Sequence, residues 1–146
     1  MNALIDTNVI LDFLLYREPQ YEDAKKIFEL TCQDKISAFT TASSITDIYY
    51  IVAKKLGSAK AKDSLRNLFN LLGIIPVDGD DCVSALDLPI IDYEDALVSA
   101  CAHKTNMDFV VTNDANFIST WNVPVKVLNP TGFIRVINNT ILELGG

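Results

Sequence analysis

The sequence has few of the residues and segments that mark several large classes of protein. It contains three cysteines, one histidine and one tryptophan in 146 residues. Cys32, Cys82 and Cys101 are odd in number and lack CxxC spacing, so we expect buried free thiols rather than disulfides or a zinc site. No apolar run approaches the roughly 20 residues of a membrane span, and the first residues do not resemble a signal peptide. We therefore expect a cytoplasmic protein with no membrane contact.

Motifs that carry metal-free catalysis are also missing. There is no serine or cysteine in a nucleophile elbow and no glycine-rich phosphate loop. His103 is the only histidine, so no histidine pair is available for acid–base catalysis, and we expect it at the surface of a helix. Hydrolytic chemistry in this chain would therefore have to come from a bound metal ion.

Positive charge is scarce overall but concentrated in one segment. The net charge is −7, which at first sight disfavours a polyanionic partner. Five of the 12 basic residues nevertheless fall between positions 54 and 66, and we call them the basic cluster: Lys54, Lys55, Lys60, Lys62 and Arg66. Seven acids and no base occupy positions 78 to 95. The basic cluster is either a phosphate-binding surface or a solvated helix face.

The hydrophobic periodicity alternates between strand and helix along the chain. Strands are predicted over 3–6, 36–41, 74–77, 109–112 and 125–128. Helices are predicted from about 9 to 14, 21 to 31, 43 to 56, 58 to 72, 81 to 86 and 92 to 104, with Ser43 or Ser44, Ser58 and Asp92 as N-caps. The segment after Pro130 is either a final helix or an extended tail. No linker or repeat divides the chain, so residues 1–146 are expected to form one domain.

Strands separated by helices imply parallel crossovers and a three-layer α/β/α sandwich around a mostly parallel five-stranded sheet. Four carboxylates follow predicted strands or lie at helix starts: Asp6, Asp47, Asp95 and Asp114. The carboxyl ends of parallel strands meet at one edge of the sheet, so these acids should converge there. Converging acids repel one another, and a hard divalent cation such as Mg²⁺ or Mn²⁺ would relieve the repulsion.

Each acid also has a purely structural interpretation. Asp6 could turn the chain and cap the first helix, and Asp114 could serve a turn. Asp92 and Asp95 have the spacing of a capping box. Asp47 could lie on a solvated face of its helix. Asp12, Asp92 and Glu94 are expected to be surface or capping residues rather than metal ligands.

Four motifs together resemble the PIN-domain family. They are Leu4-Ile-Asp-Thr-Asn-Val-Ile-Leu-Asp12, Asp92-Tyr-Glu-Asp-Ala-Leu97, Val111-Thr-Asn-Asp-Ala-Asn-Phe117 and Pro130-x-x-Phe133, in the family's order and spacing. The resemblance implies a strand order of 3-2-1-4-5 and a metal-dependent nuclease. It matches Asp6, Asp95 and Asp114 to the family's acids. Asp47 stands where glutamate is more common, and Asn116 where many relatives have aspartate.

The resemblance further implies an endoribonuclease that leaves a 5′-phosphate and a 3′-hydroxyl. Many members of this length are VapC-type toxins held inactive by a cognate antitoxin, and a homodimer is a further option. Single-stranded or loop RNA would enter a narrow acidic site most readily. Asp6, Asp95 and Asp114, with Asp47 helping, would hold one or two Mg²⁺ or Mn²⁺ ions, and the basic cluster would contact substrate phosphates.

Three other functions deserve comparison. A phosphoacceptor receiver domain needs paired acids after the first strand, but Thr7 follows Asp6. A phosphatase with a nucleophilic aspartate needs a second aspartate two residues later, and that position is Asn8. A catalytically silent PIN scaffold that binds RNA or a partner protein stays open, since Asp47 and Asn116 both depart from the commoner residue.

Overall fold

In the computed structural model, which describes residues 1–145, the strands form one fully parallel sheet. They are β1 (Asn2–Ile5), β2 (Ser37–Thr41), β3 (Gly73–Ile75), β4 (Phe109–Val111) and β5 (Lys126–Leu128). The order across the sheet is β3-β2-β1-β4-β5, as the resemblance implies. Every neighbouring pair is parallel, so the expected mostly parallel sheet is parallel throughout.

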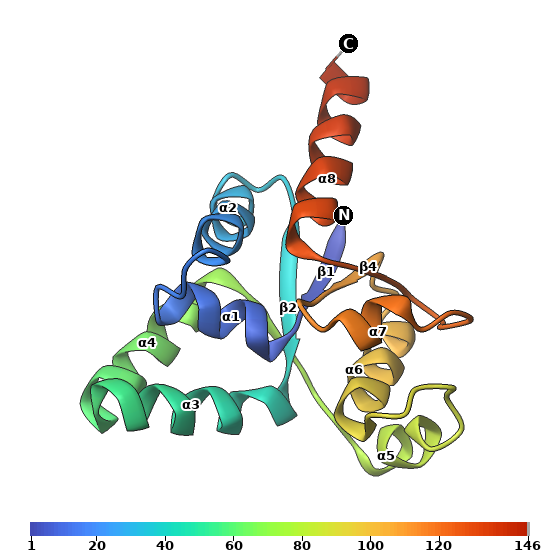
Figure 1. Ribbon diagram of the computed structural model, residues 1–146, viewed down its shortest axis with the longest axis horizontal. Helices are drawn as coiled ribbons and strands as arrows, with labels where there is room; N and C mark the ends of the chain where they lie inside the picture. Colours follow the sequence, from blue (N-terminus) through green and yellow to red (C-terminus); the bar gives the residue numbers. More distant parts are fainter. Residues whose placement is uncertain (146) are drawn as a thin grey trace.

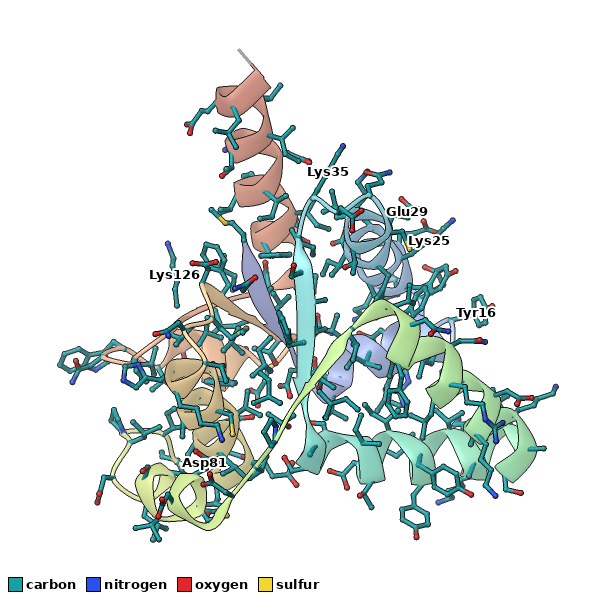
Figure 2. All side chains as sticks on the ribbon, turned by 180° about the vertical axis from the view of Figure 1, so that it is seen from behind. Tyr16, Lys25, Glu29, Lys35, Asp81 and Lys126 are labelled. Atoms are coloured by element: carbon teal, nitrogen blue, oxygen red, sulfur yellow. The ribbon has the colours of Figure 1, made fainter. Side chains whose placement is uncertain are left out.

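Helices cover both faces of the sheet, which confirms the three-layer sandwich (Figure 1). One layer contains α1 (Thr7–Leu14), α2 (Tyr21–Cys32), α3 (Ala42–Leu56), α4 (Ser58–Leu71) and α8 (Pro130–Gly145). The other contains α5 (Gly79–Ala85), α6 (Tyr93–Lys104) and α7 (Ala115–Ser119). Figure 2 shows the side chains that fill the space between the sheet and these layers.

The central strand β1 is apolar on both sides because both of its faces are covered. Ala3 and Ile5 pack into the core under α1 to α4 and α8, whereas Leu4 packs into the core under α6. β4 divides in the same way, with Val110 facing α6 and Val111 facing the opposite layer. Such continuous apolar strands are typical of parallel sheets buried on both faces.

The parallel arrangement brings the carboxyl ends of all the strands to one edge of the sheet, which we call the strand-end edge. α1 starts immediately after β1, and α3 starts immediately after β2, so both helices begin at this edge (Figure 1). α8 extends away from the sheet at the opposite end (Figure 1). Among the described residues, no helix combines the length and hydropathy needed to span a membrane.

Several helix boundaries differ from the sequence prediction. The N-cap position of α3 is Thr41 rather than Ser43 or Ser44, and its hydroxyl bonds both serine side chains at 2.9 Å. Gly57 precedes α4 with φ +91°, so Ser58 is the first helical residue and not the cap. This left-handed backbone favours glycine and permits the sharp turn between α3 and α4. The segment after Pro130 is helical, and α7 was not predicted.

The expectation of buried thiols holds only for Cys101. All three cysteines are free, but Cys32 and Cys82 are exposed. Cys32 is the last residue of α2, and Cys82 lies on the outer side of the short helix α5, so neither reaches a core. His103 is exposed near the end of α6, as predicted.

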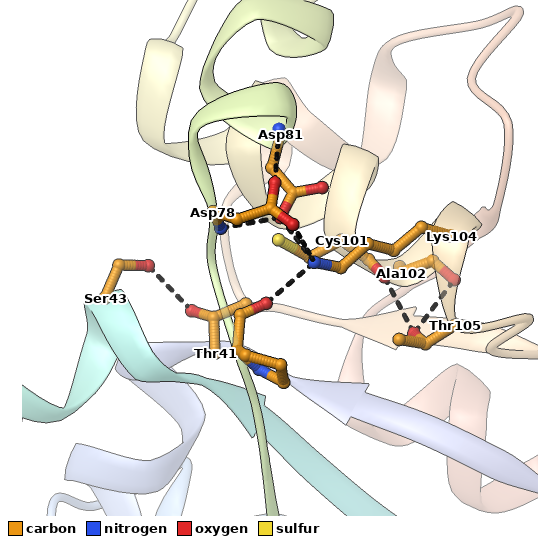
Figure 3. A network of polar contacts seen from close by, with 9 residues as sticks. Thr41, Ser43, Asp78, Asp81, Cys101, Ala102, Lys104 and Thr105 are labelled. Atoms are coloured by element: carbon orange, nitrogen blue, oxygen red, sulfur yellow. Dashed lines mark hydrogen bonds and ion pairs between the residues drawn. The ribbon is translucent and has the colours of Figure 1, made fainter.

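A polar network joins α5 to α6 (Figure 3). Asp78 and Asp81 form a reciprocal capping box at the start of α5. The ammonium group of Lys104, on α6, donates hydrogen bonds to Asp81 and, at 2.8 Å, to the carbonyl of Pro76. The Asp78 backbone bond and Lys104 hold the pKa of Asp81 below its usual value. The network fixes α5, and with it the connection that leads to α6 at the strand-end edge.

Candidate active site

Asp6 occupies the centre of the edge, directly after β1. Its Oδ1 accepts a hydrogen bond from the backbone N–H of Thr7 at 2.8 Å, and its Oδ2 accepts one from the hydroxyl of Thr112 at 2.8 Å. Asp6 is only 8% exposed. Burial raises its pKa, the two hydrogen bonds lower it, and the charge of Asp114 raises it again. Asp6 thus caps α1, as the structural interpretation held, and also belongs to a group of interacting acids.

Asp95 lies in the first turn of α6 and is 8% exposed. The N-cap of this helix is Asp92, whose carboxylate accepts a bond from the backbone N–H of Asp95 at 3.0 Å. The reciprocal bond of a capping box is absent among the described residues, so the carboxyl group of Asp95 is not used for capping. Burial, followed by the charges of Asp6, Asp92 and Asp114, raises the pKa of Asp95 to about 7.

Asp114 follows β4 and starts α7. Its Oδ1 accepts bonds from the backbone N–H groups of Asn116 at 2.9 Å and Phe117 at 3.4 Å. A side-chain hydrogen bond between Asp114 and Asp95 contributes to the raised pKa of Asp95. Asp114 and Asp95 line the same cavity, of about 840 Å³. Asp6, Asp95 and Asp114, which we call the acid cluster, therefore come together although each follows or starts a different element.

Asp47 lies at the margin of the acid cluster. It is exposed on α3 and lines a separate cavity of about 60 Å³ together with Asp6 and Glu94. Burial first, and then the charge of Asp47, raises the pKa of Glu94. Glu94 is exposed, as predicted for a surface residue, and it also lines this cavity with Asp6 and Asp47. The sequence contains a signal for this, since Glu94 and Asp95 occupy the same first helical turn.

A polar network behind Asp6 was not anticipated from the sequence. The Thr112 hydroxyl, which donates to Asp6, accepts hydrogen bonds from the Asn8 amide and from the backbone N–H of Asp114, both at 3.1 Å. The Asn8 side-chain oxygen in turn accepts from the backbone N–H of Asn113 at 3.0 Å. Thr112 is fully buried. The network connects the ends of β1 and β4 and determines how Asp6 and Asp114 are presented.

Asp12 departs from the sequence prediction, because it is buried and not at the surface. It is 6% exposed and accepts a hydrogen bond from the Asn113 amide at 2.6 Å. The Nη1 atom of Arg17 lies 3.9 Å from Oδ1 of Asp12. Burial raises the pKa of Asp12, while Arg17 and Asn113 lower it. Asp12 supports the loop after β4 and does not line either acidic cavity.

The donor chemistry of the acid cluster fits a hard divalent cation. Carboxylate oxygens are the ligands that Mg²⁺ and Mn²⁺ prefer. The carboxyl groups of Asp95 and Asp114 would coordinate an ion in place of the side-chain hydrogen bond between them. Within residues 1–145, no three His, Cys, Asp or Glu side chains are arranged so that they could hold a metal ion. The carboxylates have the ligand chemistry that such an ion needs, but their side chains would have to turn toward it to coordinate it.

The basic cluster lies away from the acids, around the turn between α3 and α4. Lys54 follows Asp47 by about two helical turns, which is about 10 Å along the axis. Figure 1 shows this turn at the far end of α3 from the strand edge. All five side chains belong to exposed residues, and Arg66 pairs with the exposed Asp63 at 2.9 Å. The five bases therefore lie on the last turn of α3 and on α4, at a distance from the acid cluster.

Comparison with known proteins defines the class. The PIN-domain family model matches residues 2–116, and the chain belongs to that family. The chain is similar to ribonuclease VapC1 of Aquifex aeolicus (strain VF5), with 27% identity over 122 residues that cover 80% of this chain and 84% of that protein.

Solved structures agree on the fold. VapC20 of Mycobacterium tuberculosis, described as a sarcin–ricin loop cleaving toxin, has a TM-score of 0.65 at 15% identity and covers 84% of this chain and 98% of its own. VapBC2 of Rickettsia felis, bound to a DNA fragment from its promoter, has a TM-score of 0.65 at 18% identity. The match covers 88% of this chain and 98% of that chain. At these identities the likeness establishes the shared fold.

Proposed function

We propose that this protein is a Mg²⁺- or Mn²⁺-dependent endoribonuclease and the toxin of a toxin–antitoxin pair. The observation that carries the proposal is the convergence of Asp6, Asp95 and Asp114 at the strand-end edge, with the pKa of Asp95 raised to about 7. Burial of these carboxylates, together with their mutual repulsion, costs the fold free energy unless a cation occupies the site. Similarity to ribonuclease VapC1 supports RNA as the substrate.

Asp6, Asp95 and Asp114 would hold the metal, with Asp47 assisting from the margin. A bound divalent ion supplies an activated water and neutralises charge on the leaving oxygen. The chain itself supplies orientation. Thr112 and Thr7 fix the two oxygens of Asp6, and the cap of α7 fixes one oxygen of Asp114. The basic cluster would bind phosphates of a single-stranded or looped RNA further along the strand.

An antitoxin partner is part of the proposal. Structures with a similar fold include a toxin–antitoxin complex from Klebsiella pneumoniae, which covers 88% of this chain at a TM-score of 0.66. A small reading frame upstream of the gene that encodes a DNA-binding N-terminus would support this part, and a lone gene would count against it.

The direct test is incubation of the purified protein with end-labelled RNA in Mn²⁺, in Mg²⁺ and in EDTA. We expect cleavage in the presence of either ion, none in EDTA, and products with a 5′-phosphate. Asp6→Asn should abolish cleavage. Asp34→Asn is the matched control, because Asp34 lies away from the acid cluster at the end of α2 and its left-handed backbone, φ 55°, suits asparagine equally.

A silent scaffold that binds RNA or a partner protein is the second candidate. It is favoured by the exposed position of Asp47 and by Asn116, which brings no carboxylate to the site. The same experiment separates the two functions. A scaffold would bind the RNA with wild-type and Asp6→Asn protein alike and would cleave it with neither.

A further inference from the structure

Two buried hydroxyl groups have no hydrogen-bond partner among the described residues, and one of them lies next to the acid cluster. They belong to Thr40 on β2 and Ser99 on α6, and both residues are 0% exposed. A buried hydroxyl without a partner costs a protein free energy. At position 99, alanine would avoid that cost and would also favour the helix more than serine does. The serine therefore calls for an explanation other than the stability of the metal-free fold.

Ser99 follows Asp95 by one turn of α6. Residues four apart lie on the same face of a helix, and side chains in helices point toward the N-terminus. The Ser99 hydroxyl is therefore directed toward the turn that carries Asp95. Asp95 is 8% exposed, and its carboxyl group forms the side-chain hydrogen bond with Asp114. The unpaired hydroxyl thus lies one turn from an acid of the cluster whose side chain is engaged with another acid.

The sheet beneath α6 offers this hydroxyl few polar groups. Leu4 of β1 and Val110 of β4 face this helix, and both are apolar. Thr112 continues the same face after β4, but its hydroxyl already donates one hydrogen bond and accepts two, which exhausts its capacity. Asp95, on the same helix face as Ser99, is therefore the acceptor best placed for it.

Coordination of an ion would give Asp95 a need for such a donor. To coordinate, Asp95 has to give up its side-chain hydrogen bond with Asp114 and turn. A carboxylate that binds a metal through one oxygen keeps a second oxygen that can accept a hydrogen bond, and bonds of this kind orient metal ligands in proteins. Ser99 can supply that bond from within the same helix.

We propose that Ser99 is a positioning residue, whose hydroxyl donates to the carboxylate of Asp95 when Asp95 turns to coordinate a divalent cation. The inference rests on the proposed function, because it needs the acid cluster to bind a metal ion. It makes the hydroxyl unfavourable in the metal-free fold and favourable in the metal-bound one. Removal of the hydroxyl should therefore affect the two states in opposite directions.

The test compares Ser99→Ala with wild type without and with Mn²⁺. In EDTA, Ser99→Ala should melt at the temperature of wild type or above it, because no hydrogen bond is lost. Mn²⁺ binding, measured by isothermal titration calorimetry, should be about tenfold weaker or more, which is the usual effect of removing a partner that orients a metal ligand. A residue with a merely structural role would lower the melting temperature and leave the affinity for Mn²⁺ unchanged.

Thr40→Val is the matched control, because it removes the other unpaired buried hydroxyl. Thr40 alternates with Ala38 along β2, and Ala38 packs into the core on the side of the sheet opposite α6. Thr40→Val should likewise not melt below wild type in EDTA. Unlike Ser99→Ala, it should bind Mn²⁺ as tightly as wild type does.

Two results would overturn the inference alone. One is Mn²⁺ binding by Ser99→Ala that equals that of wild type, and the other is a lower melting temperature of this variant in EDTA. Failure of the proposed function gives a different result, in which wild type, Ser99→Ala and Thr40→Val all bind no Mn²⁺. The acid cluster would then not be a metal site, and Ser99 would have no ligand to position.

Discussion

Thr112 donates a 2.8 Å hydrogen bond to Asp6 from the end of the neighbouring strand, although the two residues are far apart in the sequence. The Thr112 hydroxyl also accepts from Asn8 and from the backbone of Asp114. One fully buried hydroxyl therefore connects two acids of the cluster.

We predict that Thr112→Val destabilises the fold and impairs cleavage. Valine keeps the shape but leaves the buried carboxylate of Asp6 and two half-buried partners without the hydroxyl, which should cost about 1–3 kcal/mol of unfolding free energy. Urea denaturation measures the loss, and a cleavage assay measures the effect on the site. Thr112→Ser retains the hydroxyl and should stay close to wild type. A valine variant as stable and active as wild type would show that the network does not position Asp6.

The second prediction concerns pH and Asp95. Its folded pKa of about 7 lies above the usual 3.8, so between these values the folded state keeps a proton that the unfolded state has released. The contribution of Asp95 to stability is therefore lost as pH rises through this window. Without metal, Asp95→Asn should match wild type near pH 4 and exceed it at pH 8 by at most about 4 kcal/mol.

Urea denaturation in EDTA at both pH values measures this difference. Groups that titrate in both proteins cancel when the two are subtracted. A difference between variant and wild type that does not change with pH would mean that burial and the charges of Asp6, Asp92 and Asp114 do not raise the pKa of Asp95.

Divalent metal should stabilise the folded protein. An ion that binds only the folded state at ten times its dissociation constant adds about 1.4 kcal/mol, or roughly 3 to 6 °C in melting temperature. Asp6→Asn should melt higher than wild type in EDTA because it removes one repelling charge, and should respond less to Mg²⁺. Thermal melts in EDTA and in about 10 mM MgCl₂ test both the higher melting temperature of the variant and its smaller response to Mg²⁺. This concentration is ten times a dissociation constant of about 1 mM. An Asp6→Asn variant that melts lower in EDTA, beside a wild type indifferent to Mg²⁺ and Mn²⁺, would reduce Asp6 to a turn and cap residue.

The basic cluster should contribute to RNA affinity through phosphate contacts. Replacing Lys60 and Lys62 together with alanine should weaken binding and reduce the log–log salt slope by about 1.5, near 0.7 for each lost single-strand contact. Filter binding at several salt concentrations gives the slope. The Lys25 and Lys26 pair on α2 is the control (Figure 2 labels Lys25) and should leave the slope unchanged. An unaltered slope in the Lys60 and Lys62 variant would indicate a solvated helix face.

Local patterns identify the layers and the acids of this protein well. Buried apolar runs such as Ala3 to Ile5 predict parallel strands, and Asp92 was expected as the cap of α6 and is one. Short elements with little periodicity escaped prediction. α7 has only five residues, and its helical start depends on the Asp114 cap. Ser58 and Ser43 have the right chemistry for caps, but the backbone at Gly57 and Thr41 moves the caps by one or two residues.

By itself, the sequence determined which residues carry charge at strand ends and helix starts, because the hydrophobic period locates the strands and helices and the rules for crossovers make the sheet parallel. The strand order came from the resemblance to the PIN-domain family. Only the tertiary structure decided which of the charged residues share a site. It joined Asp95 with Asp114 in one cavity and put Glu94 beside Asp47 in another. It also buried Asp12 and recruited Thr112. Burial and hydrogen bonding across strands depend on contacts between residues distant in the chain, and no local pattern records them.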